Sequence, residues 1–134
     1  MKRVLLILLA ALLLTGCSAP EAQERKEAAY RQVSTQEAVD MMAREKDYII
    51  LDVRTQAEYA AAHIPGAICV PNETIGQEAV AELPDKNQLI LVYCRSGNRS
   101  KQASAKLAGQ GYTNIVEFGG INAWTGETVN GDQP

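Results

Sequence analysis

The chain has 134 residues, which is enough for one domain with a hydrophobic core and too few for two. Hydrophobic residues make up 46% of the chain and charged residues 22%, a composition typical of a globular protein rather than a disordered one. The formal net charge is −3 at pH 7. Because an acidic chain without a cluster of basic residues is a poor partner for nucleic acid, nucleic-acid binding is excluded.

The first residues have the three parts of an export signal. Two basic residues follow Met1, residues 4–14 are apolar, and two small residues precede Cys17. The apolar stretch is too short to cross the hydrocarbon core of a bilayer, which takes about 20 residues of helix. We therefore expect residues 1–16 to be a signal peptide that is removed.

The junction Leu14-Thr15-Gly16-Cys17 resembles the lipobox of bacterial lipoproteins. The resemblance implies that Cys17 becomes the acylated first residue of an exported protein, anchored to a bacterial membrane on its periplasmic or outer face. Acyl chains bind firmly, since each buried CH₂ contributes about 0.8 kcal/mol. A plain secretory signal with an incidental cysteine is the alternative. Residues 17–31 are polar and are expected to form a lipid-anchored tether.

Strand-like and helix-like segments alternate after this tether. Short apolar runs predict five strands, at residues 30–33, 48–51, 67–70, 89–93 and 114–118. Helices are predicted between them, starting after the N-cap residues Ser34 and Thr55 and spanning residues 73–83 and 100–110. This alternation indicates an α/β domain of three layers, in which helices cover both faces of a mostly parallel five-stranded sheet. We expect Gly119-Gly120 to break the last strand, and residues 126–134 to be a frayed polar tail.

The segment that carries chemistry follows the strand 89–93. Cys94 stands at the carboxyl end of this strand, where ligands bind in parallel α/β sheets, and the next residues lead into a helix. Gly97 permits a tight bend, and the helix start offers unpaired backbone N–H groups. Together with the charges of Arg95 and Arg99, these donors favour the thiolate and form an anion site. We therefore expect Cys94 to have a lowered pKa and to be a nucleophile.

This loop, Cys94-Arg95-Ser96-Gly97-Asn98-Arg99-Ser100, resembles the active-site loop of single-domain rhodaneses, C-R-S-G-x-R-S. Three further segments resemble rhodanese motifs in the same order along the chain: Leu51-Asp52-Val53-Arg54, Glu58-Tyr59 with His63-Ile64-Pro65-Gly66-Ala67, and Gly119-Gly120 with Trp124. Four motifs in sequence are a specific signal, although each is weak alone. The resemblance covers residues 32–125. One departure is Ala62, where the family usually has glycine.

The resemblance to rhodaneses implies sulfur transfer through a covalent intermediate. The Cys94 thiolate attacks the outer sulfur of a small anionic donor such as thiosulfate, sulfite leaves, and the persulfide passes its sulfur to a thiol or to cyanide. Substrate binding is then assigned to the loop residues Arg95, Ser96, Gly97, Asn98, Arg99 and Ser100. No metal and no organic cofactor is implied. The expected protein partner is a thiol acceptor or a reducing protein.

Other polar residues have structural alternatives. Asp52 and Arg54 end a strand and support the pocket, or they form an ion network with Glu58 that braces loops. His63, the only histidine, is interpreted as fixing a turn rather than as a general base. We further expect Cys69 to pack in the core rather than to form a disulfide with Cys94, and Trp124 to cover the core rather than to bind substrate.

Two other functions compete with sulfur transfer. Cys-based phosphatases and arsenate reductases place C-x₅-R around an oxyanion, whereas the spacing from Cys94 to Arg99 is C-x₄-R, one residue shorter. A non-enzymatic sulfur-carrier, binding or redox-sensing module is the rival from another class. Retention of Cys94 and both arginines favours the enzyme.

Overall fold

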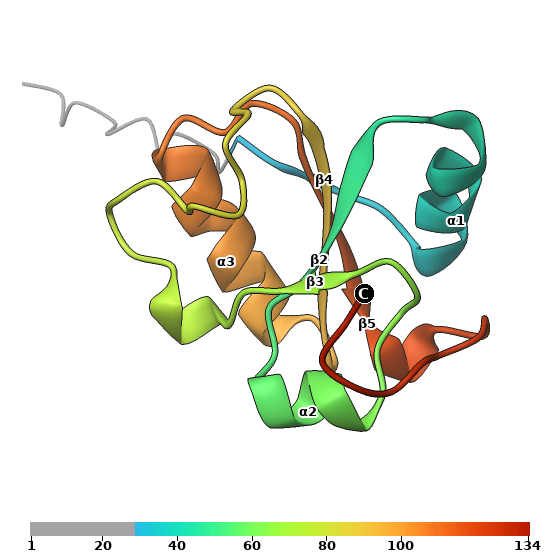
Figure 1. Ribbon diagram of the computed structural model, residues 1–134. Coiled ribbons are helices and arrows are strands. Elements are labelled where there is room, and N and C mark those ends of the chain that lie inside the picture. The colour runs from blue at the N-terminus through green and yellow to red at the C-terminus, as the bar shows by residue number, and fades with distance from the viewer. Residues whose placement is uncertain (1–28) are drawn as a thin grey trace, which may run out of the picture.

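The protein is built around one parallel sheet. The computed structural model describes residues 29–134, so the predicted signal peptide, Cys17 and most of the tether lie outside the described residues. The sheet has five strands in the order β1-β5-β4-β2-β3, and every neighbouring pair is parallel (Figure 1). Their bounds are β1 Arg31–Gln32, β2 Tyr48–Asp52, β3 Ile68–Cys69, β4 Leu89–Cys94 and β5 Ile115–Gly120. The predicted α/β fold is confirmed.

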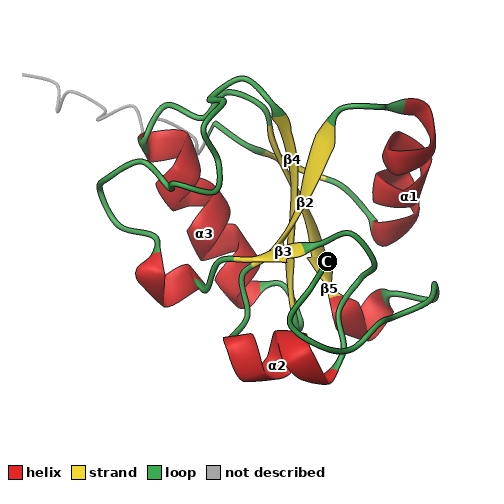
Figure 2. Ribbon diagram, viewed as in Figure 1, coloured by secondary structure: helices red, strands yellow, loops and turns green. Residues whose placement is uncertain are grey.

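Helices cover both faces of the sheet. Helices α3 (Asn98–Gly109) and α1 (Thr35–Arg44) lie on opposite sides of the sheet, as the red ribbons in Figure 2 show, and α2 (Gln56–Ala61) contributes Tyr59 to the core on the side of α1. Both predicted N-caps are present. Ser34 and Thr55 each form a reciprocal capping box, the first with Glu37 and the second with Glu58. Such caps pair backbone groups that the helix leaves open, which is why these two short helices begin where they do.

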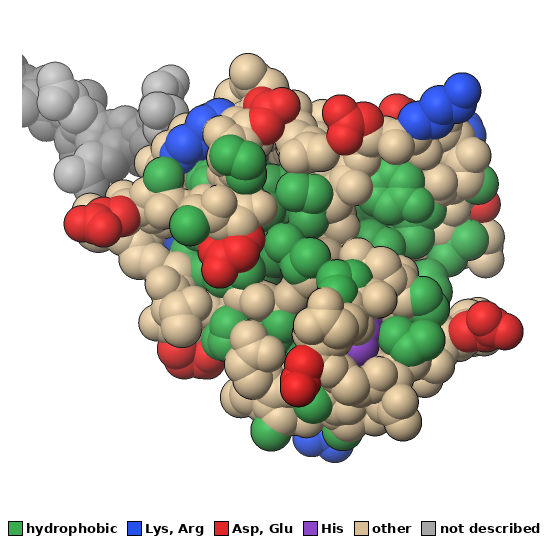
Figure 3. Space-filling view, viewed as in Figure 1, with side chains coloured by type: hydrophobic (Ala, Val, Ile, Leu, Met, Phe, Trp, Pro, Cys, Tyr) green, Lys and Arg blue, Asp and Glu red, His purple; other side chains and the backbone are tan. Residues whose placement is uncertain are grey.

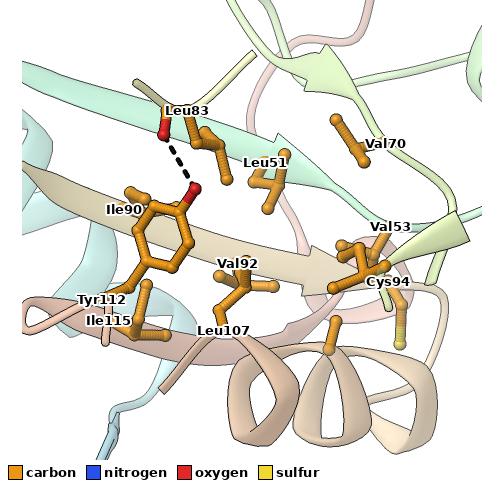
Figure 4. Packing of buried hydrophobic residues seen from close by; sticks show 12 residues of the cluster. Leu51, Val53, Val70, Leu83, Ile90, Val92, Cys94, Leu107, Tyr112 and Ile115 are labelled. Carbon is orange, nitrogen blue, oxygen red and sulfur yellow. Dashed lines mark hydrogen bonds between the residues drawn. The ribbon is translucent and has the colours of Figure 1, made fainter. Parts of the chain in front are cut away.

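Strand β4 lies inside the sheet and is buried along its whole length. Its side chains alternate between the faces: Ile90 and Val92 pack with α3, whereas Leu89 and Leu91 pack with the cluster beneath α1. Figure 4 shows the first of these clusters, with Cys94 at the end of the β4 arrow. Because each face of β4 is covered, the strand reads as a continuous apolar run. The carboxyl end of a rigid element thus presents Cys94.

Three predicted details are wrong. Residues 73–83 do not form an α-helix: a 3₁₀ turn, η1 (Asn72–Thr74), is followed by turns and bends. Gly76 disfavours a helix here, and the Tyr112 hydroxyl fixes the segment instead by donating to the Leu83 carbonyl at 2.8 Å. Strand β5 continues to Gly120, which is paired with Cys94 after a register shift. Residues 126–134 are docked, since Val129 exchanges two backbone hydrogen bonds with His63 at 2.8 and 2.9 Å.

The surface carries its charges in a scattered pattern. On the face shown in Figure 3, Lys and Arg side chains lie in small separate groups among single Asp and Glu side chains. This pattern agrees with the absence of a basic cluster from the sequence. In the part of the chain that the structure describes, no helix has the length and apolar character needed to span a membrane.

A buried ion pair fixes the carboxyl end of β2. Arg54 donates to Asp52 from Nε at 3.0 Å and from Nη2 at 2.7 Å, and Nη2 also donates to the Ala62 carbonyl at 2.7 Å. The Tyr93 hydroxyl donates to Asp52 at 2.7 Å and accepts the Ile64 N–H at 3.1 Å. Asp52 and Arg54 therefore brace the loop after α2. Ala62 has an extended backbone, with φ −166°, so this position does not require the usual glycine.

We predict that Asp52→Ala strongly destabilises the fold. The substitution leaves Arg54 buried without its carboxylate, and breaking a buried pair in this way costs about 3–5 kcal/mol. The free energy of unfolding in urea measures the loss. Glu82→Ala, at an exposed position, is the control and should change stability by no more than about 0.5 kcal/mol. A loss for Asp52→Ala as small as that of the control would contradict the bracing role.

Candidate active site

Cys94 lies where β4 ends and the loop before α3 begins. Its sulfur accepts the Gly97 N–H at 3.0 Å, and its thiol lies 3.4 Å from the Ser100 hydroxyl oxygen, to which it can donate. Gly97 has φ +115°, a left-handed conformation that strains any other residue, so the predicted need for glycine at this bend is confirmed. Cys94 is only 1% exposed. The sulfur therefore sits on the floor of a loop that curls around it.

The loop makes Cys94 more acidic than an ordinary cysteine. Burial raises the pKa of Cys94, but hydrogen bonds with the Ser100 side chain and with the backbone N–H groups of Ser100, Gly97 and Ser96 lower it further than burial raises it. The net direction is downward, as the sequence predicted. The cause of the lowered pKa differs in part from the predicted one. The main contributions come from the Ser100 hydroxyl and from backbone amides, whereas the sequence also predicted an effect of Arg95 and Arg99.

Arg99 is engaged with another residue. It donates from both Nη atoms to Glu58 of α2, at 2.7 and 2.9 Å, and this contact lowers the pKa of Glu58 to about 2. The Asp52–Arg54 pair of the predicted network is present and braces a loop, but Glu58 is not part of it and pairs with Arg99 of α3 instead. Arg95 is exposed and has no salt bridge within residues 29–134. Arg95 is accordingly an exposed cation of the loop, while Arg99 ties the loop to α2.

Asn98 and Ser96 complete the loop. Both are exposed, whereas Gly97 and Ser100 are buried. Asn98 opens helix α3, two residues earlier than predicted, and Gly97 is its N-cap. Of the loop residues predicted from the sequence, Gly97 and Ser100 contact the Cys94 sulfur, and the backbone N–H of Ser96 is directed to it. Within residues 29–134, no group of three or more His, Cys, Asp or Glu side chains is placed to hold a metal ion.

Two residues of the site were missed in the sequence. Glu117 of β5 is buried beneath α3, and its Oε1 accepts hydrogen bonds from the Ser100 hydroxyl at 2.6 Å and from the Gly119 N–H at 2.8 Å. Gly120 lies directly against the loop: a Cβ on it would come within 2.0 Å of the Arg95 carbonyl oxygen. The sequence contains one signal for each residue. Glu117 is a carboxylate inside the otherwise apolar strand 115–118, and Gly120 is the second of two adjacent glycines.

The remaining candidates have structural roles. His63 is buried, stacks on Tyr59 with ring centroids 3.7 Å apart, and places its ring nitrogens 2.8 and 2.9 Å from the carbonyls of Tyr59 and Gln133. It therefore fixes a turn, as predicted. Trp124 is partly buried against the core beneath α1 and donates to the Glu127 carbonyl at 2.9 Å.

Cys69 is separated from Cys94 by the sheet. Both cysteines are free, and β2 lies between β3 and β4. Burial raises the pKa of Cys69 to about 11, so its thiol stays protonated at neutral pH. The prediction that these two residues do not form a disulfide is confirmed.

Comparisons with known proteins identify both parts of the chain. The family model of the rhodanese-like domain matches residues 34–127, and the model of the prokaryotic membrane lipoprotein lipid attachment site matches residues 1–18. A sulfurtransferase of Allochromatium vinosum is 37% identical over 94 residues, which cover 69% of this chain and 86% of the relative. Thiosulfate sulfurtransferase PspE of Escherichia coli is 37% identical over 71 residues, 53% of this chain and 68% of the relative.

Solved structures agree with this similarity. A rhodanese with anions from E. coli aligns with a TM-score of 0.57 at 35% identity, covering 63% of this chain and 99% of that structure. A rhodanese-like domain protein from Staphylococcus aureus aligns with a TM-score of 0.63 at 31% identity, covering 72% and 93%. The likeness thus extends over nearly the whole length of each of these structures.

We predict that Gly120→Ala displaces the loop around Cys94. The added methyl group collides with backbone atoms of Arg95 and Ser96, which have no flexible end to move aside. The expected loss is about 1–3 kcal/mol in the free energy of unfolding, with slower alkylation of Cys94. Gly109→Ala is the control, because a methyl group there meets nothing within 4 Å. Unchanged stability and unchanged alkylation in Gly120→Ala would show that the loop does not depend on this approach.

Proposed function

This chain belongs to the rhodanese-like family, and on that premise we propose that it transfers sulfane sulfur through a persulfide on Cys94. The observation that carries the proposal is the position of the Cys94 sulfur, 3.0 Å from the Gly97 N–H at the floor of the loop. A thiolate in this place is stabilised by fixed dipoles, and so is an anionic persulfide that replaces it. The loop therefore stabilises Cys94 both as the thiolate and as the persulfide.

The chemistry requires two substitutions at sulfur. The Cys94 thiolate attacks the outer sulfur of thiosulfate, a new S–S bond forms, and the bond to the inner sulfur breaks with its electron pair leaving on sulfite. A thiolate or cyanide then attacks the outer sulfur of the persulfide, and the Cys94 thiolate is regenerated. The acceptor arrives only after sulfite has left, so the kinetics are ping-pong.

The surroundings of Cys94 favour a small anionic donor. Because Cys94 is only 1% exposed, a donor has to reach it with a narrow end, and the terminal sulfur of thiosulfate is a single atom. Arg95 is exposed at the loop and supplies a positive charge for the sulfonate part, while the N–H groups of the loop face the sulfur. Arg99 holds the loop against α2 through Glu58.

We predict that thiosulfate adds one sulfur atom to Cys94 and that cyanide removes it as thiocyanate. Intact-mass analysis and peptide mapping measure the first step, and colorimetric detection of thiocyanate measures the second. Cys94→Ala should abolish both steps. Cys69→Ala is the matched control and should retain them, because Cys69 lies on β3 with β2 between it and β4.

The same experiment separates the competing functions. Loading with sulfur but no release to cyanide or to a thiol would indicate a sulfur carrier. No loading at all would contradict sulfur transfer and favour a binding or redox-sensing module. Hydrolysis of a phosphate ester in a parallel assay would favour the phosphatase, although the C-x₄-R loop is one residue shorter than that chemistry uses.

We further propose that Cys17 carries a lipid that anchors the exported protein to a bacterial membrane. The match of the lipid-attachment model to residues 1–18 supports this proposal. The described domain then stands outside the cytoplasm on a short polar tether. Its sulfur donor and acceptor, a thiol or a reducing protein, must be reached there.

We predict that Cys17→Ser releases the protein from the membrane. In a bacterial host the unaltered chain should sediment with membranes and carry the mass of acyl chains, whereas the variant should lack both properties. Cell fractionation and mass spectrometry of the N-terminal peptide measure the change. If Cys17→Ser remains membrane-bound to the same extent, the anchor lies elsewhere.

A further inference from the structure

Arg99 and Glu58 form an ion pair at the rim of the loop that carries Cys94. Arg99, in the first turn of α3, donates from Nη1 to Glu58 Oε2 at 2.7 Å and from Nη2 to Glu58 Oε1 at 2.9 Å. The two side chains are 27% and 29% exposed, so the pair lies near solvent and not beneath the loop. Because the contact joins one full positive charge to one full negative charge, the pair adds no net charge to the site.

The guanidinium of Arg99 lies within electrostatic range of the nucleophile. Hydrogen bonds to Glu58 raise the pKa of Arg99 most, against burial, which lowers it, and the charges of Cys94 and Glu73 raise it further. A unit charge at such a place attracts or repels any charged molecule that approaches the sulfur. Whether Arg99 attracts an anion to Cys94 therefore depends on how far Glu58 cancels its charge.

The start of α2 holds Glu58 in place for this contact. Its Oε2 accepts the Thr55 N–H at 3.0 Å and the Thr55 hydroxyl at 3.1 Å, and the Glu58 N–H donates to the Thr55 hydroxyl oxygen at 3.2 Å. Arg99 first, and then Thr55, lower the pKa of Glu58 to about 2, although burial opposes them. Glu58 is therefore ionised at neutral pH, and the pair is a permanent feature of the site.

We propose that Glu58 is a specificity-determining residue, which neutralises Arg99 and so limits how strongly the loop attracts anions to Cys94. Arg95 is then the cation of the loop without a salt bridge to any residue in the range 29–134. The inference rests on the proposed function, because it concerns the charge of the sulfur donor and of the group that leaves.

Release of the leaving group gives a reason for this restraint. Thiosulfate and sulfite are both anions, so a second unpaired cation that binds the donor more tightly also retains sulfite. Binding that is equally strong in both states lowers KM without raising kcat. The acceptor enters only after sulfite has left, so retained sulfite slows the second half of the reaction. Pairing Arg99 with Glu58 therefore favours turnover over tight binding of the donor.

Alkylation of Cys94 with two reagents of different charge tests the proposal. Iodoacetate and iodoacetamide both form a C–S bond with the thiolate as iodide leaves, but only iodoacetate carries a negative charge. The ratio of their rates cancels any change in the thiolate fraction and measures the attraction of the site for an anion. The full-length chain is used, and peptide mass mapping separates Cys94 from Cys17 and Cys69.

Glu58→Gln removes the negative charge and keeps the helix cap, since glutamine also completes a capping box. We expect the ratio of the iodoacetate rate to the iodoacetamide rate to rise about two- to fivefold at low ionic strength, the effect of one unit charge at a partly exposed site. The rise should shrink at about 1 M salt, where screening acts within about 3 Å. Glu45→Gln, at the exposed C-cap of α1, is the control and should leave the ratio unchanged.

Two further variants show whether Glu58 acts through Arg99. Arg99→Gln should lower the ratio below that of the unaltered chain, because it leaves the charge of Glu58 without a partner. The double variant with Glu58→Gln and Arg99→Gln should return the ratio to that of the unaltered chain, because the pair again carries no net charge. In the transfer assay, Glu58→Gln should be inhibited by a lower concentration of sulfite.

An unchanged or lower ratio in Glu58→Gln would overturn the proposal and leave the pair a purely structural role. A double variant whose ratio stays as high as that of Glu58→Gln, or unchanged inhibition by sulfite, would overturn it as well. Alkylation needs no sulfur donor, so the ratio can stay unchanged while thiosulfate still loads Cys94, which refutes only the role of Glu58. A higher ratio without any sulfur loading supports that role and contradicts sulfur transfer. Resistance of Cys94 to both reagents would overturn both.

Discussion

Two buried carboxyl groups hold the end of strand β4, one on each face of the sheet. Successive side chains of a strand point to opposite faces, so Tyr93 and Cys94 diverge at the point where the strand ends. The Tyr93 hydroxyl donates to Asp52 at 2.7 Å, and Cys94 contacts Ser100, which donates to Glu117 at 2.6 Å. Everything proposed for this protein depends on that position, because a cradle of N–H groups works only if the sulfur stays at its centre.

The acidity of Cys94 in an acidic protein follows from local dipoles rather than from net charge. The chain carries −3 overall, and Arg99 is already paired with Glu58. What lies nearest the sulfur is the amide of Gly97, at 3.0 Å, with the first turn of α3 behind it. Amides fixed by the fold need no reorganisation when charge appears on sulfur, whereas flexible arginine side chains must be ordered first. The two arginines therefore differ in role: Arg99 fixes the loop against α2, whereas Arg95 faces solvent.

The sequence predicts features that are encoded locally. Continuous apolar runs predict the strands, capping boxes predict the starts of α1 and α2, and the residues between β4 and α3 predict the loop that contains Cys94. Contacts between distant segments could not be predicted in this way. Gly120 lies against Arg95 only because β5 is the neighbour of β4 in the sheet. The segment 73–83 does not form the expected helix, and its end is held by the Tyr112 hydroxyl, which donates to the Leu83 carbonyl. The partner of Arg99 was missed for the same reason, because a salt bridge between α2 and α3 leaves no periodic trace in the chain.

The same geometry determines where the sulfur can go. Cys94 packs in the cluster beneath α3, whereas Cys69 packs against the cluster on the opposite face, and β2 runs between their strands. A disulfide requires Cα atoms within about 7 Å, which two strands separated by a third do not allow. The persulfide proposed for Cys94 would therefore not be resolved by Cys69, and its outer sulfur would leave to an external thiol or nucleophile. Because Cys94 is only 1% exposed, an acceptor of this proposed kind would have to enter the loop with a slender group, and the same burial would limit access of larger oxidants to the thiol.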